Sequence, residues 1–132
     1  MPKNRPNPGS PQDWMARAHS DLAIANAPLP DGAYYEDLCF HAHQAAEKAL
    51  KAVYRHYGYI FRRTHDLDEL VTGLKLKGVQ IPAILEEATG LSNFAWEARY
   101  PGLYEPVLEE EFREAFHLAR SVVTWAEKEM AG

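Results

Sequence analysis

Cysteine is nearly absent from this chain, and long apolar runs are missing. The 132 residues include one cysteine, Cys39, so no disulfide can form within the chain, which fits a reducing compartment. No apolar run approaches the roughly 20 residues that cross a bilayer, and the N-terminus lacks the apolar stretch of a secretion signal. We therefore expect a cytoplasmic protein that makes no contact with a membrane.

The chain also has fewer basic residues than acidic ones. There are 14 Lys and Arg against 19 Asp and Glu, a formal net charge of −5 at pH 7, which argues against a protein that coats nucleic acid non-specifically. Residues 48–63 depart from this balance, because they hold five basic residues and no Asp or Glu. Residues 105–132 show the opposite bias, with seven Glu and three basic residues. The first segment predicts a surface for phosphates or an acidic partner, with unrelated charged faces as the alternative.

Several signatures of enzyme chemistry are missing as well. The sequence has no glycine-rich phosphate loop, no nucleophile elbow and no cysteine-based metal site. His43 and Glu47 are four residues apart, a spacing compatible with metal binding on one helix face, but no third ligand accompanies them. We expect neither a metal site nor a cofactor.

The sequence shows clear helical periodicity. Ser10 as N-cap and Pro11 in the first helical position predict the start of one helix, and Asp66 with Glu69 predicts a capping box at another. Gly90 and Ser92 are expected to bend a third. Apolar residues three and four apart, bounded by turn residues, predict helices over 10–27, 33–57, 67–75, 82–99 and 108–130.

No stretch alternates apolar and polar residues as a strand does, so we predict an all-α fold. The expected architecture is an up-and-down bundle of four main helices plus one short helix. Residues 1–10 contain three prolines and a glycine and are expected to form a flexible tail. Residues 11–132 are expected to form a single domain.

Four short patterns fall on these elements: Trp14-x3-Ala18-x2-Asp21-Leu22, the run from Cys39 to Ala52, His65-Asp66-Leu67, and Arg99-Tyr100-Pro101. Together they resemble the HEPN domain, over roughly Trp14 to Ala126. The resemblance implies a helical bundle that forms a homodimer and is often encoded beside a minimal nucleotidyltransferase. Many such pairs act as toxin and antitoxin, and the ligand that the resemblance implies is RNA or a nucleotide.

Family members that cut RNA use an arginine followed four to six residues later by a histidine, in a metal-independent site where two subunits meet. The corresponding positions after Arg99 hold Tyr104, Glu105 and Pro106, so the histidine is missing. A tyrosine with a pKa of about 10 is a poorer base near neutrality than an imidazole with a pKa of about 6.5. If this chain cuts RNA, we expect Arg99 to bind the phosphate and His65, or another histidine, to act as the base.

The favoured hypothesis is therefore a non-catalytic or weakly catalytic partner of a minimal nucleotidyltransferase. A metal-independent ribonuclease toxin and a stand-alone helical scaffold are the alternatives. Each candidate residue also has a structural alternative. For Lys48, Lys51 and Arg55 it is a solvated helix face, and for Arg99 it is a hydrogen bond to the carbonyls at a helix end. For His65 it is fixation of the loop, and for the two tyrosines it is cover for the edge of the core. The candidate residues for nucleotide or RNA binding are Lys48, Lys51, Arg55, Arg99, Tyr100 and Tyr104, and those for catalysis are Arg99 and His65.

Overall fold

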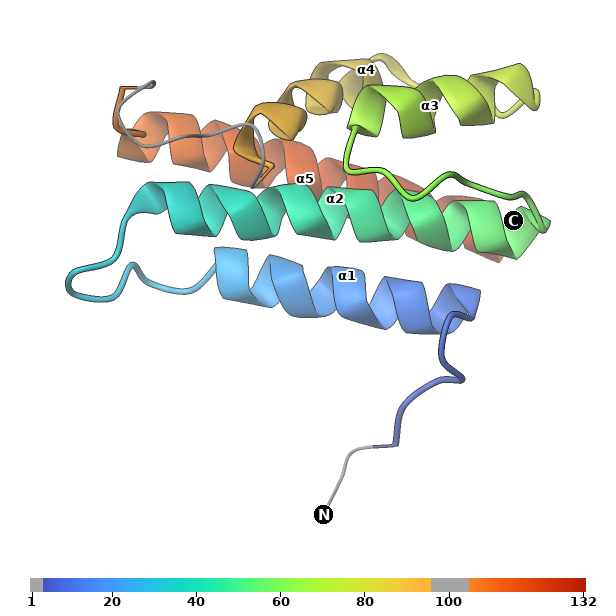
Figure 1. The fold of residues 1–132 in the computed structure, drawn as a ribbon, viewed down its shortest axis with the longest axis horizontal. Coiled ribbons are helices and arrows are strands. Elements are labelled where there is room, and N and C mark those ends of the chain that lie inside the picture. Colours follow the sequence, from blue (N-terminus) through green and yellow to red (C-terminus); the bar gives the residue numbers. More distant parts are fainter. Residues whose placement is uncertain (1–3, 96–104) are drawn as a thin grey trace.

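The computed structural model describes residues 4–95 and 105–132. No strand occurs within these ranges, which confirms the predicted all-α class, and no helix among them is long and apolar enough to span a bilayer. The elements are α1 (Pro11–Ala25), α2 (Tyr35–Tyr57), α3 (Leu67–Leu76), α4 (Ala83–Ala88), the 3₁₀-helix η1 (Thr89–Phe94) and α5 (Glu109–Ala131) (Figure 1).

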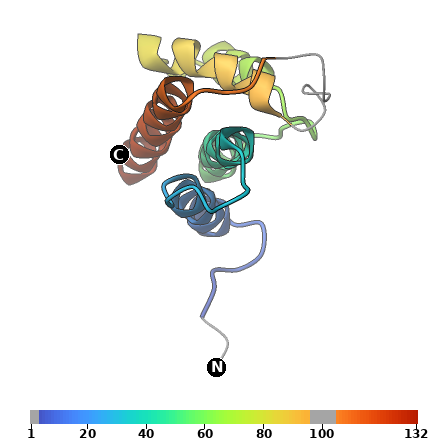
Figure 2. The ribbon, with the colours of Figure 1, turned by 90° about the vertical axis from the view of Figure 1, so that its left-hand side faces the viewer.

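The three longest helices lie side by side, with α2 between α1 and α5 (Figures 1 and 2). α1 runs antiparallel to α2, whereas α2 and α5 run in the same direction. Tyr35 stacks on Phe112 at the start of both α2 and α5, and Tyr57 donates a hydrogen bond to Glu129 at their far ends. The parallel arrangement arises because residues 58–66, here called the return segment, lead the chain back along α2 before α3 begins.

Two of the predicted helix ends are confirmed by their hydrogen bonds and backbone angles. Ser10 Oγ accepts the Asp13 N–H at 3.1 Å, and the Asp13 carboxylate accepts the Gly9 N–H at 2.9 Å. These two reciprocal hydrogen bonds cap the N-terminus of α1. α2 ends at Gly58, whose φ of 75° is the left-handed conformation that glycine adopts without steric cost.

The predicted helix over 82–99 is wrong for residues 89–95. There the α-helix stops and the chain tightens into η1, which ends before the extended residue Ala95. Gly90 disfavours continuation of the α-helix, and the Thr89 hydroxyl donates to the Glu86 carbonyl at 2.7 Å, inside the last turn of α4. The predicted residues 96–99 lie outside the described ranges.

The predicted capping box at α3 is also wrong in its second half. Asp66 caps the helix by accepting the Asp68 N–H at 3.0 Å. Glu69 does not reach back to the cap; it accepts a hydrogen bond from Arg62 Nε at 3.1 Å instead. That bond holds the pKa of the Glu69 carboxyl below its ordinary value, against the opposing effect of burial.

Close contact between helices depends on small side chains along α2. Five of its alanines have no solvent exposure, and such short side chains let α1 and α5 approach the central helix from two sides. The predicted buried position of Cys39 is confirmed, since its side chain is likewise inaccessible. These alanines are Ala42, Ala45, Ala46, Ala49 and Ala52.

We predict that Gly73→Ala destabilises the protein by about 1–3 kcal/mol, the usual cost of overpacking. A methyl group at Gly73 would lie well inside van der Waals contact of the Tyr54 hydroxyl, which donates to the Leu70 carbonyl at 2.6 Å. Urea unfolding measures the change. In a Tyr54→Phe background the same substitution should cost less. Stabilisation by Gly73→Ala, as helix propensity alone would give, would contradict this account of the α2–α3 contact.

Candidate functional site

A buried polar cluster lies where the return segment passes α2. His43, Glu47 and Lys51 come from α2, and His65 comes from the end of the return segment; together they are called the Glu47 cluster. The three α2 residues are buried, with exposures of 0% for His43, 3% for Glu47 and 5% for Lys51. Charged side chains are rarely buried this deeply unless they are paired, so the contacts among them decide whether the fold tolerates them.

Both carboxylate oxygens of Glu47 accept a hydrogen bond. Lys51 Nζ donates to Oε2 at 2.8 Å, and His65 Nδ1 donates to Oε1 at 2.8 Å. His43 Nε2 donates to the His65 carbonyl oxygen at 2.9 Å. Carboxylates and carbonyls only accept, so these contacts assign a proton to Nδ1 of His65 and to Nε2 of His43. The Glu47 cluster thus joins α2 to the return segment through both a side chain and the backbone.

The ammonium of Lys51 points into the molecule. Its Nζ lies 5.4 Å from the ring centroids of both Trp14 and Phe61, a distance at which aromatic faces attract a cation. With Glu47 on one side and two rings around it, Lys51 is held by the fold. Lys51, predicted from the sequence to bind phosphate, therefore lies in a buried position.

His65 is the accessible member of the cluster. Its side chain is 49% exposed, while that of Glu47 beside it is 4% exposed. Because His65 Nδ1 is hydrogen-bonded to the Glu47 carboxylate, a proton exchanged with a group outside the cluster passes through His65 Nε2. A carboxylate that fixes the tautomer and orientation of a partly exposed imidazole is the arrangement that acid–base chemistry needs.

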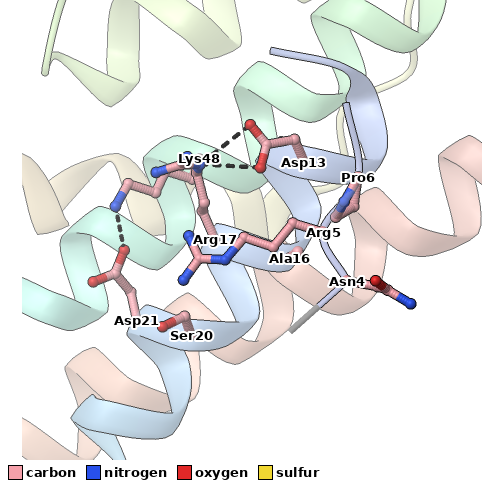
Figure 3. Close-up of a pocket in the computed structure, with 9 residues that line it drawn as sticks. All are labelled: Asn4, Arg5, Pro6, Asp13, Ala16, Arg17, Ser20, Asp21 and Lys48. Carbon is pink, nitrogen blue, oxygen red and sulfur yellow. Dashed lines mark hydrogen bonds and ion pairs between the residues drawn. The ribbon is translucent and has the colours of Figure 1, made fainter. Parts of the chain in front are cut away.

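A separate pocket of about 420 Å³ is lined by the N-terminal segment, α1 and α2. Figure 3 shows Arg5, Arg17 and Lys48 reaching toward it from the N-terminal segment, from α1 and from α2. This hollow, here called the Lys48 pocket, is lined by Asn4, Arg5, Pro6, Asp13, Ala16, Arg17, Ser20, Asp21 and Lys48.

Two carboxylates anchor the cations of the Lys48 pocket. Asp21 accepts from Lys48 Nζ at 2.6 Å and contacts His41 Nδ1 at 2.9 Å. Asp13 accepts from Arg17 Nε at 3.1 Å. The Gly9 N–H, with help from Arg17, holds the pKa of Asp13 below its ordinary value. Three cations against two carboxylates leave the pocket with a positive balance.

The structure separates the basic residues that the sequence grouped together. Lys48 lies in the pocket, Lys51 is buried, and the Arg55 guanidinium is 4.5 Å from the centroid of the Phe61 ring. The candidate residues Arg99, Tyr100 and Tyr104 lie outside the described ranges.

Arg5 and Arg17 are the residues that sequence reasoning missed. Arg17 follows Asp13 by four residues, the spacing of a helix ion pair, and this signal was present in the sequence. No such signal indicated that Arg5 lies at the Lys48 pocket, because its position depends on how the chain before α1 is placed. In the described part of the chain, no three His, Cys, Asp or Glu side chains are grouped so that they could hold a metal ion.

Comparison with known proteins identifies one family and two similar solved structures. The model of the HEPN domain matches residues 11–129. The crystal structure of TT1696 from Thermus thermophilus is 30% identical with a TM-score of 0.80. That of ST0689, described as an archaeal HEPN homologue, is 30% identical with a TM-score of 0.73. In both cases the similarity covers 92% of this chain and 98% of the other. No functionally curated protein matches.

We predict that Glu47→Gln lowers the free energy of unfolding by about 3 kcal/mol, because it leaves the buried Lys51 ammonium without its counter-charge. Urea unfolding followed by circular dichroism measures the change. Lys51→Met, combined with Glu47→Gln, should restore part of the loss, since methionine can occupy the space between the Trp14 and Phe61 rings without a charge. If the two substitutions are simply additive, the charges of Glu47 and Lys51 are not coupled.

Proposed function

Because the chain belongs to the HEPN domain family, we propose that it is a dimeric partner of a minimal nucleotidyltransferase in a toxin–antitoxin-like pair. It binds the phosphates of a nucleotide and is non-catalytic or weakly catalytic. The observation that carries this proposal is the meeting of Arg5, Arg17 and Lys48 at one pocket.

The composition of the Lys48 pocket supports a phosphate ligand. Arg5, Arg17 and Lys48 line it together with the Ser20 hydroxyl. Guanidinium groups bind phosphate through paired N–H donors, and an ammonium binds it as a point charge. A volume of about 420 Å³ lies within the range of small-ligand sites. An incoming phosphate can compete for Arg17 and Lys48 at the rim, since their side chains are 50% and 23% exposed.

The missing histidine supports a binding role. Imidazole is the side chain that transfers protons near neutral pH, and the positions where the histidine is expected after Arg99 hold Tyr104, Glu105 and Pro106. The proposals of a nucleotidyltransferase partner and of a dimer are supported by membership of the HEPN family.

We predict that Arg17→Ala combined with Lys48→Ala weakens nucleotide binding at least about tenfold, because each lost charge-assisted hydrogen bond contributes about 1.5–3 kcal/mol. Isothermal titration with ATP and with pyrophosphate measures this, and the second titrant shows whether phosphate alone suffices. The matched control is Arg113→Ala with Lys75→Ala, which removes two surface cations that are paired elsewhere, with Glu109 and Glu86. An equal loss in the control would contradict a site at the Lys48 pocket.

Light scattering and capture assays on the same samples test the rest of the proposal. The wild-type chain should be a dimer and should retain the nucleotidyltransferase encoded beside it. If the chain is a monomer and retains no nucleotidyltransferase, the partner hypothesis is contradicted, even if ATP binds.

A metal-independent ribonuclease is a second candidate, favoured by the contact between His65 and Glu47. In this reading His65 Nε2 takes the proton of a ribose 2′-hydroxyl, whose oxygen attacks the adjacent phosphorus as the bond to the 5′-oxygen breaks. Water protonates the departing 5′-oxygen, and the hydroxide released takes the proton back from His65. Glu47 orients the ring and stabilises the imidazolium that forms. Arg99, outside the described residues, would bind the phosphate.

If the second candidate is correct, cleavage of mixed RNA in EDTA should fall at least about 100-fold in both His65→Ala and Arg99→Ala. His56→Ala, which removes an exposed imidazole on α2, is the matched control and should cleave as the wild type does. Loss in Arg99→Ala with full activity in His65→Ala would assign the base to another residue. Absence of cleavage by the wild-type chain would remove this candidate and leave the binding role.

A further inference from the structure

A second hollow lies on α5 and belongs to neither site described above. It has a volume of about 320 Å³. Figure 2 shows α5 at the edge of the bundle, with no other described element on its outer side. This α5 hollow is lined by His117, Arg120, Ser121, Thr124, Trp125 and Lys128.

The lining of the α5 hollow contains no carboxylate. Within the described part of the chain, neither Arg120 nor Lys128 forms an ion pair, whereas Arg113 on the same helix is paired with Glu109. The two Glu residues that flank Lys128 in sequence are engaged elsewhere: Glu127 contacts His19 of α1, and Glu129 accepts from Tyr57 of α2. The hollow is therefore a positive patch on a helix that is acidic overall.

The hollow also offers an aromatic ring beside its charges. Trp125 is only partly buried against the core, and its indole shares the lining with Arg120 and Lys128. These two cations are eight residues apart on α5, or about 12 Å along the axis. A chain of phosphates with flat bases is the ligand that uses both features at once, because phosphates pair with the cations and a base stacks on the ring.

We propose that the α5 hollow binds a short stretch of single-stranded nucleic acid, with phosphates at Arg120 and Lys128 and one base on Trp125. An acidic peptide shares the negative charge but supplies no base to stack on the indole, so the observations favour nucleic acid. This surface lies on α5, apart from the residues of the Lys48 pocket, and the inference does not depend on the proposed function.

The test is fluorescence anisotropy of a labelled oligouridine of about ten nucleotides, at about 50 and about 200 mM salt. Arg120→Ala with Lys128→Ala should weaken binding at least tenfold at low salt. It should also reduce the slope of log K against log salt by about 1.4, since each contact on a single strand contributes about 0.7. Trp125→Leu, which keeps an apolar group against the core, should weaken binding about fivefold or more, with the salt slope unchanged.

Two controls remove the same charge outside both proposed sites: Arg113→Ala with Lys75→Ala, and Arg62→Ala with Lys77→Ala. Both should bind the oligonucleotide within about twofold of the wild type. An equal loss in either control would overturn the proposal, as would failure of the wild type to bind. Competition by polyglutamate or by base-free polyphosphate as strong as that by unlabelled oligouridine would also overturn it, because the bases would then contribute nothing.

Discussion

The fold depends on one buried carboxylate, that of Glu47. Its two oxygens are satisfied by Lys51 from the same helix and by His65 from the return segment. An unpaired buried charge costs several kcal/mol, so the return segment must lie against α2 for the charges to be tolerated. That position sets where α3 begins, and it lets α5 run parallel to α2. A polar contact thus fixes the topology of a bundle whose core is mostly apolar.

The pairing of charges also explains why net charge is a poor guide to the surfaces of this molecule. On α2, Lys51 is buried against Glu47 and Lys48 pairs with Asp21. On α5, which carries six of the 13 glutamates, Arg120 and Lys128 remain outside any ion pair in the described residues. The segment that looked basic in the sequence is largely neutralised by its own fold, and the segment that looked acidic presents a positive face.

The sequence was sufficient for those features that depend on neighbouring residues. Helical periodicity gave the all-α class, and Ser10 and Gly58 marked helix ends because capping is a local interaction. Gly90 and Ser92 indicated a bend in the fourth predicted helix, but the end of α4 at Ala88 was not predicted, since the apolar spacing continues past that residue. Sequence spacing placed Lys48, Lys51 and Arg55 on one side of a helix, but which of them is buried depends on Trp14 and Phe61 from elsewhere in the chain. The Lys48 pocket was missed for the same reason, because it joins residues 4–6 to α1 and α2.

The parallel course of α2 and α5 has an electrical consequence. Parallel helices place their positive dipole ends together, a repulsive arrangement unless negative charge is added there. Glu36 and Glu109 supply it in the first turns of the two helices, and Glu36 also accepts the Val107 N–H at 3.2 Å. Glutamates concentrated at this end leave the far half of α5 comparatively positive, so the side-chain charge of α5 changes along its length. An approaching polyanion is oriented by that polarity before it touches the surface.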